Sequence, residues 1–249
     1  LSGVLIKSLG VYTICRIFFN VIGLSPVLSS ILLFLGALSM VVGGLLALGQ
    51  WDFKRLLAYS SISQIGYIIL GIGLGTPLGI LGGLFHLLNH SIFKSLLFLN
   101  SGAVEYSTGT RDLRQMGGLS KKMPVTSATN FIASMSIAGI PPLSGFWSKL
   151  LIIIAAVQAN RNGYAFWAVL VSVLTLAMYI KVLKYAFLGS LNERWQGVRE
   201  VPVFMRLSMQ ALAFISIIGG ALLLFGIREG FLAQASNALI EGSKYASSI

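Results

Sequence analysis

Charged residues are scarce in this sequence. Asp, Glu, Lys and Arg make up 10% of its 249 residues, whereas 56% of the residues are hydrophobic and the mean hydropathy is +0.86. Soluble globular domains carry about 25% charged residues. The low charge content therefore excludes an ordinary soluble domain and favours a protein that crosses a membrane several times.

The side chains that build most enzyme and metal sites are also few. The single cysteine, Cys15, excludes an intrachain disulfide, and one cysteine with two histidines cannot form a closed metal site. No glycine loop precedes a Lys-Ser or Lys-Thr pair in the spacing that holds phosphates. We therefore expect no catalytic residue, no metal and no cofactor in this chain.

Acidic residues are outnumbered, with 7 Asp and Glu against 18 Lys and Arg and a net charge of +11. The basic residues concentrate in alternate connections, which are Lys54 and Arg55, the loop 107–124 and the loop 184–206. Cytoplasmic loops of membrane proteins carry such an excess. The pattern therefore predicts a cytoplasmic N-terminus and an external C-terminus, and it argues against a nucleic-acid partner.

Long apolar runs are what the sequence has in abundance. A helix needs about 20 mainly apolar residues to span a bilayer. Seven stretches qualify, so we expect an all-α polytopic membrane protein with a single transmembrane domain over 1–249. The expected spans are 2–23, 27–49, 54–74, 78–105, 125–158, 163–187 and 203–226. The last stretch, 228–249, spaces apolar residues helically among polar ones and predicts an amphipathic interfacial helix.

The fifth expected span contains an interruption. Gly139, Pro141, Pro142 and Gly145 follow one another closely, and the two prolines remove two backbone donors. The helix must therefore break between Gly139 and Gly145. Lys149 follows within about two helical turns. A broken helix beside a charge is typical of an ion pathway through a membrane.

Further cations lie within the expected spans. His86, His90 and Lys94 follow one another at intervals of four residues. Each interval advances a helix by about 6 Å and rotates it by about 40°, so the three side chains form one stripe. A lysine that has lost its hydration can exchange a proton near neutral pH, and a histidine already does so. Water between such groups would complete a proton pathway.

The candidate ion pathway joins groups from several spans. Asp52, at the start of the third span, would hold or release Lys54 electrostatically. The residues of the pathway are Lys7, Asp52, Lys54, His86, His90, Lys94 and Lys149.

Several of these groups also have a simpler interpretation. Topology alone accounts for Lys54 and Arg55 at a cytoplasmic helix end. Lys181 lies near a helix end, from which its ammonium group would reach the interface. His86 is either part of the pathway or a histidine whose hydrogen bonds are satisfied inside the bundle. The polar residues of the third span either carry water or bind neighbouring helices.

Four motifs, in order, resemble a known family. Residues 50–67 are similar to the Q-x-D-x-K-R-x-x-A-Y-S-S-x-S-Q/H-x-G stretch of antiporter-like membrane subunits. Residues 86–94 resemble the histidine and lysine helix of that family, and 111–119 resemble its following loop. Residues 139–149 resemble its broken helix with a terminal lysine or glutamate. The family occurs in respiratory complex I, membrane-bound hydrogenases and Mrp-type sodium/proton antiporters.

The resemblance implies a protein of about fourteen spans in two inverted repeats, of which this sequence matches the eighth to fourteenth helices. It implies that Lys7 links two half-channels, that Lys54 and the histidine–lysine stripe line a polar axis, and that Lys149 leads to the exit. No counterpart of the first half is seen. The sequence is therefore either the C-terminal half of a longer or split subunit, or a truncated copy completed by another chain.

We therefore expect a subunit that moves protons or sodium ions in a multisubunit redox-driven complex. Iron–sulfur, flavin or nickel–iron centres would lie in its partners, as in a quinone dehydrogenase or a hydrogenase. Two alternatives are a subunit of a cation/proton antiporter without a redox partner, and a structural subunit that conducts nothing. The expected partners are other membrane subunits and lipid. The expected location is the inner membrane of a prokaryote or an energy-converting organelle membrane.

Overall fold

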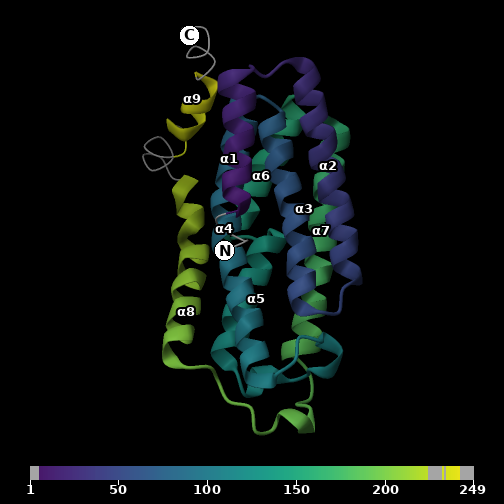
Figure 1. Cartoon of the computed structure of the whole chain (residues 1–249), viewed down its shortest axis with the longest axis vertical. Coiled ribbons are helices and arrows are strands. Elements are labelled where there is room, and N and C mark those ends of the chain that lie inside the picture. The colour runs from purple at the N-terminus through teal and green to yellow at the C-terminus, as the bar shows by residue number, and fades with distance from the viewer. Residues whose placement is uncertain (1–5, 224–231, 233, 242–249) are drawn as a thin grey trace.

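The computed structural model describes residues 6–223, 232 and 234–241, which form a bundle of helices packed side by side (Figure 1). Among these residues there is no strand, only one isolated bridge between Asp52 and Asp112. The helices are α1 (Lys7–Cys15, extended by a π-helical turn, Arg16–Val21), α2 (Pro26–Gly49), α3 (Phe53–Gly73), α4 (Pro77–Thr108), α5 (Pro124–Ala138), α6 (Ser144–Gln158), α7 (Asn162–Val182), α8 (Val203–Ile218) and α9 (Gln234–Ile240).

The chain is an all-α polytopic membrane protein. Four helical segments are long and apolar enough to cross a membrane by length and composition: Pro26–Gly49, Phe53–Gly73, Asn162–Phe187 and Val203–Ala221. α4 is longer than any of these, at 32 residues, and carries the histidine–lysine stripe that lowers its hydropathy. The observed helices follow the expected spans closely from the second span to the sixth.

Local sequence chemistry sets the helix ends. Ser25, Asp52 and Thr76 precede α2, α3 and α4, and each side chain accepts a hydrogen bond from a backbone N–H of the first turn. Such caps satisfy donors that a helix start leaves unpaired. Gly109 ends α4 in the left-handed conformation, with φ 72°, which glycine adopts without steric penalty.

Glycine allows α2 and α3 to pack at backbone contact. A Cβ atom added at Gly66 would lie 2.5 Å from the Gly36 carbonyl oxygen and 2.5 Å from the Met40 nitrogen. Small residues at such a crossing let membrane helices approach closely. The pairing of α2 and α3 therefore depends on Gly66 and its counterpart Gly36.

The three basic connections lie together at one end of the bundle (Figure 1). The Leu113 N–H donates to the Trp51 carbonyl at 2.9 Å, and the Gly118 N–H donates to the Leu188 carbonyl at 3.0 Å. The Trp195 indole donates to the Gln115 carbonyl at 2.9 Å. The loops 50–52, 109–123 and 188–202 thus form one basic-loop end, as their alternation along the sequence predicts.

The expected amphipathic helix is described only in part. α9 packs against α4 and the π-helical turn, with Ser236 and Leu239 buried. Residues 228–231, 233 and 242–249 lie outside the described residues, as do 2–5 and 224–226 of the first and last expected spans. The interfacial position of this segment stays a prediction.

Candidate functional site

Lys94 lies in the middle of α4 and is fully buried. Its ammonium group donates to the Leu57 carbonyl at 3.0 Å, to the Ser60 hydroxyl and to the Tyr179 hydroxyl at 3.3 Å. All three acceptors are neutral, and the ion pairs found among the described residues do not include Lys94. The site therefore solvates the ammonium group through polar groups without fixing its charge by a carboxylate.

His90 lies one turn before Lys94 on the same stripe and is also fully buried. Neither of its ring nitrogens has a hydrogen-bond partner among the described residues. Its ring packs edge-on against Phe93, with 5.8 Å between the ring centroids. Buried polar atoms normally have partners, so the two nitrogens mark a position suited to water.

His86 is held on both sides. Its Nδ1 lies 2.8 Å from the Ser148 hydroxyl of α6, and its Nε2 lies 3.1 Å from the Gln64 side-chain oxygen of α3. The hydrogen bonds of His86 are thus satisfied inside the bundle, as one of the two interpretations predicts. Its ring joins α3, α4 and α6 at the level of the helix break.

The break itself is formed by residues 139–143, between α5 and α6. Gly139 adopts a left-handed conformation, with φ 85°, and the Pro141–Pro142 peptide is cis. Gly145 is already the second residue of α6, so the non-helical stretch is shorter than Gly139–Gly145. A Cβ atom on Gly145 would collide with the Ser136 carbonyl oxygen. Gly145 therefore serves close packing of the two half-helices.

Lys149 reaches back from α6 to the end of α5. Its ammonium group donates to the Ile137 carbonyl at 2.8 Å and to the Ser172 hydroxyl at 3.2 Å, and it lies 4.7 Å from the centroid of the Tyr67 ring. The last carbonyls of a helix have no intrahelical partner and carry partial negative charge. The break thus creates the acceptors that hold this buried lysine.

The lysines and histidines of the interior form one connected series. Lys149 interacts electrostatically with His86, and His90 interacts with His86, Lys94 and Lys7. Lys7 is half-buried in the first turn of α1, and the hydroxyl of its neighbour Ser8 lies 3.3 Å from the Ser91 hydroxyl of α4. The structure thus brings five of the seven predicted residues together along α4.

The other two predicted residues lie at the basic-loop end, away from this series. The ion-pair partner of Lys54 is Glu105, at 2.6 Å, so the electrostatic role expected of Asp52 toward Lys54 stays a prediction. Asp52 caps α3 and lies 3.8 Å from Arg111, which also contacts Glu105 at 3.5 Å. The Lys54 side chain is 40% exposed. The sequence did not predict this network, because Glu105 and Arg111 are far from Asp52 and Lys54 along the chain. The end of α4 and the loop after it bring them to the start of α3.

Three further side chains belong to the site and were missed as its members. Tyr179 and Ser172 of α7 bind Lys94 and Lys149, and the Tyr67 ring lies beside Lys149. Ser172 and Tyr179 are seven residues apart and therefore share one helix face. Two polar residues on one face of the otherwise apolar α7 were the sequence feature that could have identified Ser172 and Tyr179.

The geometry suits transfer of a proton or cation along a polar column inside a helix bundle. Among the described residues there is no group of three or more His, Cys, Asp or Glu side chains that could hold a metal ion. The column instead consists of lysine ammonium groups, imidazoles, hydroxyls and main-chain carbonyls.

Residues 1–175 match the family described as NADH:quinone oxidoreductase/Mrp antiporter, TM. The chain belongs to this antiporter family. The expected resemblance is thereby confirmed. An Na(+)/H(+) antiporter subunit of Alkalihalophilus pseudofirmus is 43% identical over 190 residues, which cover 76% of this chain and 38% of that relative. An F(420)H(2) dehydrogenase subunit of Methanosarcina mazei is 36% identical over 245 residues, which cover 93% of this chain and 36% of that relative.

A solved structure contains a chain with the same fold as this member of the antiporter family. A chain in the structure of the Mrp complex from Dietzia sp. DQ12-45-1b superposes with a TM-score of 0.89 and 29% identity. The match covers 99% of this chain and 54% of that chain. The present chain thus spans less than two thirds of each of these relatives, and the solved neighbour is a chain of a complex.

Proposed function

We propose that this chain moves protons or sodium ions across a membrane as an antiporter-like subunit of a multisubunit complex. The observation that carries the proposal is the series Lys149, His86, His90, Lys94 and Lys7. A buried charge in a membrane helix is costly, roughly 2.5–3.5 kcal/mol on insertion scales. Two buried lysines, a half-buried lysine and two buried imidazoles in one series are better explained by an ion pathway than by helix packing.

We assign the direction of the pathway from the break and the loops. Lys149 would be the group nearest the exit, Lys94 and His90 the central relay, and Lys7 the link to a second half-channel. Lys54, paired with Glu105 at the basic-loop end, would act at the entrance together with Asp52. We take the basic-loop end as cytoplasmic because of its excess of lysine and arginine.

A redox-driven complex is the preferred setting, with the electron-carrying centres in other subunits. Similarity to an F(420)H(2) dehydrogenase subunit over 93% of this chain supports it. The second candidate is a cation/proton antiporter without a redox partner, which the similarity to the Na(+)/H(+) antiporter subunit of Alkalihalophilus pseudofirmus favours. The set of proteins that copurifies with this chain separates the two settings.

The matched length supports a single transmembrane domain that corresponds to the C-terminal half of such a subunit. The remaining half would be supplied by the same polypeptide or by a neighbouring chain. α9 and the residues around it would lie along the membrane interface.

Ion uptake by vesicles that contain the whole complex tests the proposal. Lys94→Ala removes the central relay, so we expect uptake to fall by at least about tenfold, the scale of a lost proton-transfer group. Lys184→Ala is the matched control, since Lys184 is exposed near the end of α7. Unchanged uptake in Lys94→Ala, with the complex fully assembled, would favour the structural subunit that conducts nothing.

A further inference from the structure

Three more buried polar side chains lie between the ion series and the basic-loop end. Asn100 and Ser101 of α4 and Asn130 of α5 are each at most 1% exposed. The Asn100 Nδ2, the Ser101 hydroxyl and the Asn130 Oδ1 have no hydrogen-bond partner among the described residues. Leaving such a group unsatisfied costs about 1–3 kcal/mol, so three together point to water.

Ser101 continues the stripe of α4 beyond Lys94. It lies seven residues, or two turns, after Lys94 and hence on nearly the same face, about 10 Å further along the helix. That direction leads to the end of α4 at Thr108 and to the basic loops. A few water molecules would bridge this distance.

α5 supplies the opposite wall at the same level. The Thr129 hydroxyl donates to the Asn100 Oδ1 at 2.8 Å, which fixes the register of the two helices. Thr126, Asn130 and Ser134 follow one another at intervals of four residues, and all three are fully buried. They form a polar stripe that starts one turn from the basic-loop end of α5 and runs toward the break.

An acidic group lies where this stripe begins. The Glu200 carboxylate accepts hydrogen bonds from the Val125 N–H at 2.8 Å and from the Thr126 hydroxyl at 2.6 Å. Glu200 comes from the long loop before α8, 74 residues further along the chain than Thr126. It brings negative charge to the loop end of the polar stripe, in a region otherwise rich in lysine and arginine.

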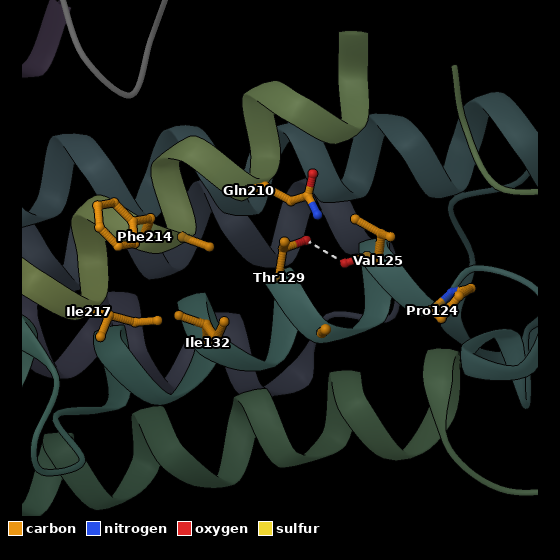
Figure 2. Close-up of a pocket in the computed structure, with 9 residues that line it drawn as sticks. Pro124, Val125, Thr129, Ile132, Gln210, Phe214 and Ile217 are labelled. Atoms are coloured by element: carbon orange, nitrogen blue, oxygen red, sulfur yellow. Dashed lines mark hydrogen bonds between the residues drawn. The ribbon is translucent and has the colours of Figure 1, made fainter. Parts of the chain in front are cut away.

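The outer side of α5 is apolar by contrast. A groove of about 410 Å³ between α5 and α8 is lined by residues such as Val125, Ile132 and Phe214 (Figure 2). Thr129 borders this groove, and its hydroxyl bonds to the Val125 carbonyl (Figure 2). The same hydroxyl also contacts the Asn100 Oδ1 inside the bundle. Thr129 therefore lies between this mainly apolar groove and the polar groups inside the bundle.

We propose that Glu200, Thr126, Asn130 and Ser101 line a water-filled access route from the basic-loop end to Lys94. Its cargo is a proton or a small monovalent cation. This inference rests on the proposed function, because it assigns the route by which ions reach the central relay. Polar residues that only join helices would be expected to satisfy one another, whereas Asn100, Ser101 and Asn130 each keep an unpaired atom.

Thiol accessibility tests the route in vesicles that contain the whole complex. In a Cys15→Ala background, Ser101→Cys and Asn130→Cys are treated with a membrane-impermeant cationic methanethiosulfonate. Ala47→Cys is the control, since Ala47 is 0% exposed yet only one turn from the basic-loop end of α2. The reagent is added on the side from which Lys121→Cys, in an exposed loop, is labelled.

A hydrated thiol forms the reactive thiolate, whereas a thiol in a dry apolar site does not. We therefore expect Ser101→Cys and Asn130→Cys to be labelled at least about tenfold faster than Ala47→Cys. Rates equal to that of Ala47→Cys would overturn the route. Ser101→Cys nearly preserves the native side-chain size, so the test does not depend on how Asn130→Cys folds.

Ion uptake, measured before and after labelling of the same vesicles, tests whether the route carries ions. We expect the adduct at Ser101→Cys to lower uptake severalfold, whereas Ala47→Cys vesicles keep their uptake. Full labelling without any loss of uptake would overturn the route.

The two proposals fail in different ways. Rapid labelling of Ser101→Cys and Asn130→Cys together with normal uptake in Lys94→Ala would contradict the proposed function, and the route would then lead to no ion relay. Slow labelling together with lost uptake in Lys94→Ala would keep the proposed function and remove the route.

Discussion

At the residue scale, the two fully enclosed lysines are solvated by the protein and paired with no acid among the described residues. Lys94 binds a carbonyl and two hydroxyls, and Lys149 binds main-chain carbonyls and Ser172. Neutral acceptors stabilise an ammonium group less than a carboxylate does. Such lysines therefore suit the proposed proton relay, whereas Lys54 is paired with Glu105.

The two histidines of α4 provide a matched pair that separates function from stability. His86→Leu leaves Ser148 and Gln64 without their partner, so we expect a loss of about 1–3 kcal/mol of stability. His90→Leu removes no hydrogen bond to the described residues, so we expect stability to be kept while ion uptake falls. Thermal unfolding of the purified complex and uptake by vesicles are the two measurements.

The opposite ranking would contradict this assignment. If His90→Leu destabilised the complex more than His86→Leu, then His90 would be a structural residue. Normal uptake in His90→Leu would remove it from the pathway.

The sequence sufficed to predict the cations of the site, because charges inside apolar spans stand out. Their partners were not predictable. The contact between Lys94 and Tyr179 joins residues 85 positions apart, and it depends on which helices are neighbours in the bundle. Periodicity shows the buried face of a helix and leaves its neighbour undetermined.

At the element scale, the broken helix and the close glycine contacts give the bundle its interior. The interruption after Ala138 exposes carbonyls that hold Lys149, and α4 passes beside it with the histidine–lysine stripe. The break was predictable because two prolines cannot continue a helix. The role of Gly145 was not, since it follows from contact with Ser136 on the other side of the break.

Two glycines in helix interiors test how tightly the helices pack. A Cβ atom at Gly66 would meet the backbone of α2 at 2.5 Å, whereas a Cβ atom at Gly102 meets nothing within 4 Å. We therefore expect Gly66→Ala to separate α2 from α3 and to destabilise the protein by about 1–3 kcal/mol. Gly102→Ala should be neutral or slightly stabilising, because alanine favours helix.

The yield of folded, assembled complex and its thermal midpoint measure both effects. Equal behaviour of Gly66→Ala and Gly102→Ala would show that the α2–α3 contact tolerates expansion, contrary to the backbone contact between these helices.

At the scale of the whole molecule, the charge distribution and the bundle agree. The loops with basic residues meet at one end, and the turn at Arg161 lies between α6 and α7 at the other. Alternation along the sequence predicted this grouping, since antiparallel spans return every second loop to the same side. The spatial order of the helices and the association of the three loops required the structure.

Side-specific labelling tests the proposed orientation. Lys121→Cys and Arg161→Cys, both at exposed positions, are introduced singly in a Cys15→Ala background. In right-side-out vesicles, an impermeant thiol reagent should label Arg161→Cys, and it should label Lys121→Cys only after permeabilisation. The reverse pattern would place the basic loops outside.

The central claim is that ions pass along the buried cations of α4 and α6. The most direct measurement is proton and sodium uptake per assembled complex in Lys149→Met, which keeps nearly the length of the side chain and removes its charge and its three donors. We predict a loss of at least about tenfold, as for a missing proton-transfer group, with normal assembly and with full uptake in Lys184→Met. Full uptake in Lys149→Met would contradict the claim.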